Sequence, residues 1–201
     1  MLGKALESLF IRVWVIMKLN FFFWLYSLAG GVVLGVGPAL KVISELFIRH
    51  EFEYKDITFQ ESWLLFKANF KRGNILFLST AGIAAFLVYN LYLALQVKGL
   101  LFLIIDFILV FVLLYLFASF LYALIFDSSY DISLPQLARL SFISSLSNFP
   151  SFLKIIIGSA IVFGITWKYK GLILFGTAGM LIIWNFIATK NWRAKIEERI
   201  G

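Results

Sequence analysis

The chain has 201 residues, of which 62% are hydrophobic and only 14% are charged, and its formal net charge is +7. Soluble domains average about 45–50% apolar and about 25% charged residues, so this composition excludes an ordinary soluble fold and predicts an integral membrane protein. The absence of cysteine excludes disulfides, thiolate metal ligands and a cysteine nucleophile.

The basic charge lies in short segments between long apolar runs. This distribution is typical of flanks that orient membrane helices, and it argues against nucleic acid as a partner because no basic face is formed. Membrane lipid is therefore the first predicted partner.

The first 18 residues predict an amphipathic helix at the membrane interface. Lys4, Glu7 and Arg12 interrupt an apolar stripe at helical spacing, and no small-residue cleavage site marks a signal peptide. The stripe consists of Leu2, Leu6, Leu9, Phe10, Val13, Trp14 and Met17. The alternative is an N-terminal extension of the first membrane helix.

Five apolar segments are long enough to cross a bilayer, which requires about 20 residues. The predicted spans are 19–40, 75–97, 100–126, 150–167 and 171–189. The fourth requires Lys154 to extend its ammonium group to the headgroup layer. The predicted fold is an all-α membrane protein, a bundle of about five transmembrane helices with an N-terminal amphipathic helix. The whole chain, 1–201, forms a single membrane domain.

With five spans, one side of the membrane receives twice as many Lys and Arg residues as the other. The positive-inside rule places that side in the cytoplasm. Segments 41–74 and 127–149 and the tail 190–201 are then cytoplasmic, and the C-terminus faces the cytoplasm.

Gly31 and Gly35 give the first span a pair of small residues four positions apart, which predicts a close helix-packing surface. A seam within the bundle and an interface with a dimer mate or partner are both open. Pro38 is expected to bend or end this span near the interface, because proline lacks an N–H group.

Residues 41–74 form the largest polar element, and a basic aromatic helix is predicted within it. Trp63, Phe66 and Phe70 fall on one face, and Lys67 and Lys71 lie one turn apart beside it. Such a helix suits anionic headgroups or the cytoplasmic face of a transporter. The residues predicted to contact a partner or lipid are Trp63, Phe66, Lys67, Asn69, Phe70, Lys71, Arg72, Gly31 and Gly35.

Asp106 is the only ionisable residue well inside a predicted span. An aspartate in hydrocarbon costs roughly 2.5–3.5 kcal/mol, so it should face other helices, water or a partner. A tight turn at Lys98 and Gly99 would bring it level with Asn90 and Tyr92, which predicts an intramembrane polar cluster. The cluster is either a hydrogen-bonded packing contact or a solute or proton site.

No catalytic, metal or cofactor site is predicted. His50 is the only histidine, and no second histidine or cysteine completes a ligand set. Asp127 and Asp131 are the best-placed acidic pair, but helix capping or turn formation explains them more simply. The serine-rich stretch 127–149 predicts a short helix from about Leu134. No P-loop motif occurs, so the chain should not hydrolyse ATP.

Three motifs resemble the YesL family of bacterial membrane proteins. They are LNFFFWL from Leu19 to Leu25, GVGPA from Gly35 to Ala39, and SWLLFKANFKR from Ser62 to Arg72. Phe126-Asp127, Ser133-Leu134 and Asn148-Phe149-Pro150 resemble a later polar stretch of the family. The first helix departs from the family pattern, because residues 28–34 contain neither proline nor threonine.

The resemblance implies a bacterial cytoplasmic-membrane protein of five or six helices, often encoded beside carbohydrate ABC importers. The expected function is a non-enzymatic subunit accessory to such an importer, with the permease subunits as partners, aiding assembly, stability or gating. The alternatives are an autonomous small-solute transporter or channel and a membrane regulator of saccharide uptake.

Overall fold

The computed structural model describes residues 2–200, and every regular element in that range is an α-helix. The helices are α1 (Leu2–Ala29), α2 (Val33–His50), α3 (Phe59–Ala94), α4 (Leu100–Ser129), α5 (Leu134–Ser147), α6 (Phe149–Lys168), α7 (Leu172–Phe175) and α8 (Thr177–Ile200). The predicted all-α fold class is confirmed.

Four helices are long and apolar enough to cross a membrane. They are Gly3–Ala29 in α1, Phe59–Ala94, Leu100–Ser129 and Phe149–Lys168. The predicted span 171–189 is divided at Gly176 into α7 and α8, and neither is among the four candidates in the described part of the chain. The helical bundle is thus close to the expected one, with four candidate spans in place of about five.

The predicted first span, 19–40, is not one helix. α1 runs without a break from Leu2 to Ala29, so the interfacial stretch and the start of the span form a single helix. The chain then turns at Gly31 and Val32, which have φ angles of 80° and 64°. The sequence offered no apolar-to-polar boundary there, because both sides of the turn are apolar.

Pro38 does not end a helix, which corrects that part of the prediction. It lies inside α2, which continues to His50. The boundary expected at residue 74 is also absent, because α3 is one helix of 36 residues. The basic aromatic segment and the span 75–97 therefore belong to the same helix. Thr58 caps its start by accepting a hydrogen bond from the Glu61 backbone N–H at 3.3 Å.

The serine-rich stretch forms α5, in agreement with the predicted short helix. Ser133 and Gln136 make a capping box, in which each side chain accepts a hydrogen bond from the backbone N–H of the other residue. Asn148 caps α6 in turn, accepting from the Ser151 backbone N–H at 3.4 Å. The local sequence therefore defines both helix starts.

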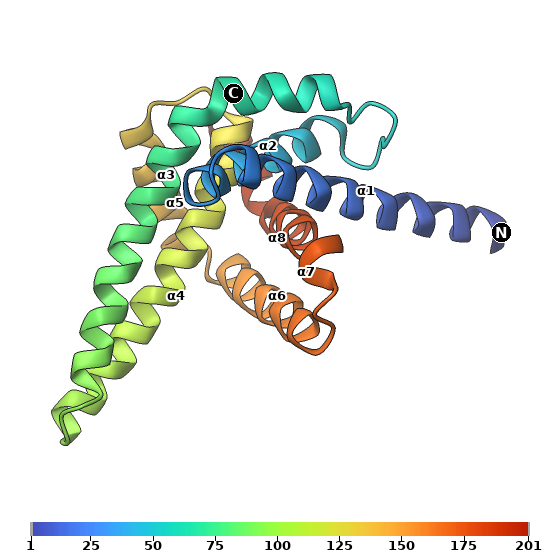
Figure 1. Ribbon diagram of the computed structural model, residues 1–201. Coiled ribbons are helices and arrows are strands. Elements are labelled where there is room, and N and C mark those ends of the chain that lie inside the picture. The colour runs from blue at the N-terminus through green and yellow to red at the C-terminus, as the bar shows by residue number, and fades with distance from the viewer. Residues whose placement is uncertain (1, 201) are drawn as a thin grey trace.

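Figure 1 shows how the long helices diverge from a common core. α3 and α4 form a long antiparallel hairpin that projects to the lower left, while α6 descends separately beside α7 and α8. α1 passes below the first part of α3, which lies at the top of the view, and extends to the right towards the N-terminus. The core lies where α1, α2, α4 and α8 meet, and its largest fully buried side chains are Tyr26, Tyr122, Phe47 and Phe126.

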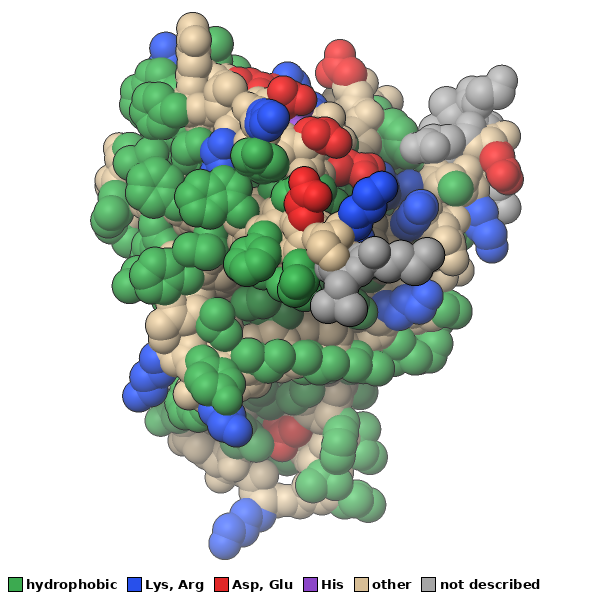
Figure 2. Space-filling view, turned by 90° about the vertical axis from the view of Figure 1, so that its right-hand side faces the viewer, with side chains coloured by type: hydrophobic (Ala, Val, Ile, Leu, Met, Phe, Trp, Pro, Cys, Tyr) green, Lys and Arg blue, Asp and Glu red, His purple; other side chains and the backbone are tan. Residues whose placement is uncertain are grey.

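The surface separates charge from apolar area. In Figure 2, acidic and basic side chains gather at the top centre and upper right of the visible face, and hydrophobic side chains cover the upper left and a band across the middle. Blue side chains of Lys or Arg return near the lower edge. An apolar band between two charged levels is what a bilayer requires of a protein surface.

Candidate functional site

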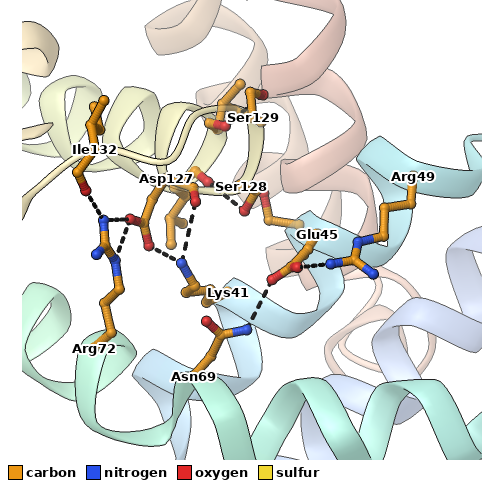
Figure 3. A network of polar contacts seen from close by, with 12 residues as sticks. Lys41, Glu45, Arg49, Asn69, Arg72, Asp127, Ser128, Ser129 and Ile132 are labelled. Carbon is orange, nitrogen blue, oxygen red and sulfur yellow. Dashed lines mark hydrogen bonds and ion pairs between the residues drawn. The ribbon is translucent and has the colours of Figure 1, made fainter.

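A buried ion cluster joins the middle of α2, the first half of α3 and the last turn of α4. Asp127, near the end of α4, accepts hydrogen bonds from Lys41 of α2 and Arg72 of α3. The Arg72 Nε lies 2.6 Å from Asp127 Oδ1, and Lys41 Nζ contacts the other carboxylate oxygen. Figure 3 shows the two cations approaching the carboxylate from different helices.

Burial makes this cluster energetically demanding. The side chain of Asp127 is 0% exposed and that of Lys41 4%, whereas Arg72 retains 31%. Charges removed from water are tolerated only when they are paired and their hydrogen bonds are satisfied. Two cations share one anion here, and the partly exposed guanidinium carries the excess charge towards solvent.

The cluster also ties down the linker that follows α4. Arg72 Nη2 donates to the Ile132 carbonyl at 2.5 Å, and Lys41 Nζ lies 3.3 Å from the Asp127 carbonyl oxygen. Arg72 thus holds the linker that leads into α5, and Lys41 holds the last turn of α4. The ion cluster therefore connects three helices and the linker between α4 and α5.

A second network of polar side chains lies along the C-terminal half of α2. Asn69 Nδ2 donates to Glu45 Oε2 at 2.9 Å, and Arg49 pairs with Glu45 one helical turn away. His50 Nε2 lies 2.8 Å from Glu61 Oε2. No group of three or more metal-ligating side chains occurs among the described residues.

The predicted basic aromatic helix is divided between an inward and an outward face. Phe66 is 5% exposed and stacks on Tyr26 of α1, with ring centroids 4.8 Å apart. Asn69 and Arg72 are held by Glu45 and Asp127. These three predicted contact residues are therefore engaged inside the chain.

The outward face retains Trp63, Lys67, Phe70 and Lys71, which together are called the α3 surface below. Trp63, Phe70 and both lysines are exposed. The Lys67 ammonium lies 5.9 Å from the centroid of the Trp63 ring, within cation–π range. Lipid or partner contact by these four residues remains a prediction.

The predicted Gly31–Gly35 surface is not a helix face, which corrects that interpretation. Gly31 lies in the turn between α1 and α2, and a Cβ atom there would meet nothing within 4 Å. Gly35 packs instead on its own chain, because its Cβ would lie 2.2 Å from the Ser27 carbonyl oxygen. Both glycines lie at the turn between α1 and α2. Because Gly31 lies outside any helix, the four-residue spacing does not place the two glycines on one helix face.

The close approach between helices involves Gly37, two residues after Gly35 in α2. A Cβ on Gly37 of α2 would lie 2.4 Å from the Gly73 carbonyl oxygen of α3. A Cβ on Gly73 would in turn lie 2.8 Å from the Pro38 Cα. This contact brings Lys41, one turn after Gly37, and Arg72, next to Gly73, to the same carboxylate.

The predicted cluster of Asn90, Tyr92 and Asp106 does not form within the described chain. Asn90 Nδ2 donates to the Phe86 carbonyl of its own helix at 2.7 Å, and Tyr92 is exposed. Asp106 Oδ1 is enclosed and has no hydrogen-bond partner. The tight turn pairs the two helices, but the register places Asn90 among apolar side chains that include Ile105 and Leu109.

Sequence reasoning missed the role of Lys41 and assigned Asp127 to capping or a turn. Both residues stand at the edge of an apolar run, where a charge normally marks the membrane boundary. The available signal was that Lys41 and Asp127, which carry opposite charges, each stand at the end of an apolar run. To interpret this signal as an ion pair, one must know that α2 and α4 are neighbours.

These features define a multi-pass α-helical membrane protein whose charged end is held together by internal ion pairs. Residues 16–91, which reach from within α1 to near the end of α3, match a family model described as "Protein of unknown function, DUF624". The matched segment contains Lys41, Arg72 and the α3 surface, but not Asp127. No curated protein and no solved structure matches the chain.

Proposed function

We propose that this chain is a YesL-type, non-enzymatic membrane subunit accessory to a carbohydrate ABC importer, where it aids assembly, stability or gating of the permease complex. The match over residues 16–91 supports the family part of this proposal. The motif from Ser62 to Arg72, which carries the resemblance, lies inside that segment.

The observation that carries the proposal is the α3 surface. Its neighbours on the same helix are used for internal packing and ion pairs, whereas Trp63, Lys67, Phe70 and Lys71 remain exposed. Exposed aromatic and cationic side chains side by side are the composition of interface hot spots. In the proposed orientation this surface faces the cytoplasm, as does the C-terminus, and the membrane is the bacterial cytoplasmic membrane.

The interior offers less to an autonomous transporter. The cavity between the hairpin and α6–α8 has a volume of about 320 Å³, and its lining is apolar apart from Thr80, whose hydroxyl donates to the Leu76 carbonyl. The buried charges of Lys41 and Asp127 are paired with each other. A polar solute would leave its hydrogen bonds unsatisfied in such a cavity, which favours the accessory role.

A pull-down in mild detergent tests the proposal. The tagged protein is purified from its own membranes, and co-purifying chains are identified by mass spectrometry. We expect stoichiometric permease subunits with the wild type and about a tenfold loss with Lys67→Ala plus Lys71→Ala, equivalent to about 1.4 kcal/mol.

The matched control is Lys168→Ala plus Lys170→Ala, which removes two exposed lysines at the α6–α7 turn. These changes should leave recovery unaltered. Recovery of the chain alone, in several detergents and in lipid nanodiscs, would contradict the proposal and favour an autonomous transporter or channel.

A further inference from the structure

α1 lies crosswise to the α3–α4 hairpin. Figure 1 shows the hairpin running downwards from the core, whereas α1 runs across the view to the right. All three helices are long and apolar enough to cross a membrane. They cannot all do so, because spanning helices tilt from the bilayer normal by no more than about 40°. The hairpin supplies two of the candidates, and α4 has a higher mean hydropathy than α1, so the hairpin is the element that spans.

The N-terminal half of α1 exposes one continuous apolar face, called the α1 stripe below. It consists of exposed side chains at helical spacing: Leu6, Leu9, Phe10, Val13, Trp14 and Met17. At 100° per residue these positions fall within an arc of about 140°. The opposite side of the helix carries buried Val15 and Leu19 and the exposed cation Lys4. The α1 stripe therefore faces away from the protein core.

The charged loop between α2 and α3, residues 51–58, covers one side of α1. Lys18 Nζ donates to the Tyr54 carbonyl at 2.9 Å, and the Arg12 guanidinium lies 5.1 Å from the centroid of the Phe52 ring. The charged residues of this loop are Glu51, Glu53, Lys55 and Asp56. Figure 1 shows the loop above α1.

The apolar helix α7 lies on the other side of α1. Trp24 Nε1 donates to the Ile173 carbonyl at 2.8 Å, and Trp24 follows Leu6 by 18 residues, which is about five helical turns. The α1 stripe is thus on the side of the helix that meets α7. The exposed side chains of α7 are Ile173, Leu174 and Phe175. In Figure 1, α7 lies below α1, on the side to which the hairpin projects. α1 therefore separates a charged level from an apolar one.

The polar side chains of this half of α1 suit lipid headgroups. The charged residues are Lys4, Glu7, Arg12 and Lys18, an excess of basic charge. Trp14, at the edge of the α1 stripe, lines a groove with Tyr54 of the charged loop. Tryptophan is enriched at the headgroup level, and each basic residue near an anionic leaflet gains about 1 kcal/mol. An apolar face with tryptophan at its edge and basic residues on the polar side is the composition of helices that lie on a membrane.

We infer that α1 lies in the plane of the membrane, with the α1 stripe in the acyl boundary of one leaflet and its basic residues at anionic headgroups. The in-plane segment extends beyond the predicted interfacial helix, residues 1–18, to Ala29. Lys4 and the charged loop then lie on one side of the membrane, and the hairpin turn at Lys98 lies on the other. This contact with lipid is independent of any partner protein.

Single cysteines test the topology, because the natural chain has none. Lys4→Cys, Lys55→Cys and Lys98→Cys, all at exposed positions, are introduced separately into the full-length protein. Each is labelled with a membrane-impermeant maleimide in right-side-out and in inverted membrane vesicles. We expect positions 4 and 55 to react in the same vesicles and position 98 in the opposite ones. Position 4 reacting opposite to position 55 would show that α1 spans, and position 98 reacting with position 55 would show that the hairpin does not. Either result overturns the inference.

Fluorescence quenching tests the contact with lipid. An environment-sensitive fluorophore is attached at Phe10→Cys, in the α1 stripe, or at the matched control Ser8→Cys, which is exposed on the polar side. The protein is reconstituted in phosphatidylcholine and phosphatidylglycerol vesicles that contain doxyl-labelled acyl chains. We expect at least about threefold stronger quenching at position 10 than at position 8, because the apolar face of an interfacial helix reaches the acyl boundary. Equal quenching at the two positions would overturn the inference.

Vesicles without phosphatidylglycerol test the role of the headgroup charge. Quenching at position 10 should fall by about twofold in these vesicles, because the basic residues of α1 lose their attraction to the leaflet. A fluorophore at Phe107→Cys, which is exposed on the hairpin, should be quenched equally in both kinds of vesicle. Quenching at position 10 that does not depend on phosphatidylglycerol would overturn the assignment of anionic lipid.

Discussion

The two halves of the α3–α4 pair have opposite surroundings. Near the core, Phe66 and Asp127 are buried, stacked or ion-paired by α1 and α2. At the hairpin end, Phe86 is 67% exposed and Asp106 Oδ1 lacks a partner. Because the same two helices supply both halves, helix propensity does not explain the difference. The difference comes from the helices that pack against each half. Matched substitutions in the two halves measure how much this packing contributes to the free energy of unfolding.

The largest expected difference separates the two aspartates. Asp127→Leu leaves Lys41 and Arg72 without their shared anion, and breaking a buried pair in this way costs about 4 kcal/mol. Asp106→Leu should cost nothing. Thermal unfolding of the purified proteins measures both, and equal losses would refute the comparison.

Alanine substitutions of Phe66 and Phe86 should lower the free energy of unfolding by amounts that differ by about 3 kcal/mol. Phe66→Ala removes the ring that stacks on Tyr26 and leaves a cavity between α1 and α3. Phe86→Ala trims an exposed ring, so the same unfolding assay should detect a change below about 0.5 kcal/mol. A large effect at Phe86 would show that the hairpin packs within this chain.

The glycine pair tests the helix contact that positions the ion cluster. Gly37→Ala places a Cβ 2.4 Å from the Gly73 carbonyl oxygen, so α2 and α3 must separate, at a cost of about 2 kcal/mol. Gly82→Ala meets no atom and should stabilise α3 by up to about 1 kcal/mol. Opposite signs in unfolding temperature are expected, and the same sign would contradict the assigned packing.

Alanine substitutions of Asn20 and Asn90 give the smallest expected difference in the free energy of unfolding, about 1–2 kcal/mol. Buried Asn20 donates to the Leu174 carbonyl at 2.6 Å and accepts from the Ala178 N–H at 2.8 Å, so Asn20→Ala unties α1 from α7 and α8. Asn90→Ala removes one bond within its own helix. Limited proteolysis should show faster cleavage near the α6–α7 turn only for Asn20→Ala.

Parts of the candidate site were predictable from local spacing. The i, i+3, i+7 pattern placed Trp63, Phe66 and Phe70 together on one helix, and the rings of Phe66 and Phe70 do lie 5.5 Å apart. The pattern did not distinguish the buried ring from the exposed ones. Burial depends on where α1 crosses α3, and helical periodicity contains no information about that crossing.

The sequence by itself determined that this protein is an all-α membrane protein, because long apolar runs must form helices to satisfy their backbone hydrogen bonds in lipid. Only the tertiary structure decided that the first span breaks at Gly31 and that Asp127 is shared by Lys41 and Arg72. It also decided that Asp106 Oδ1 has no hydrogen-bond partner among the described residues. In a uniformly apolar solvent, composition indicates which segments enter the membrane. It does not specify which helices become neighbours, since that choice depends on close packing and a few polar pairs.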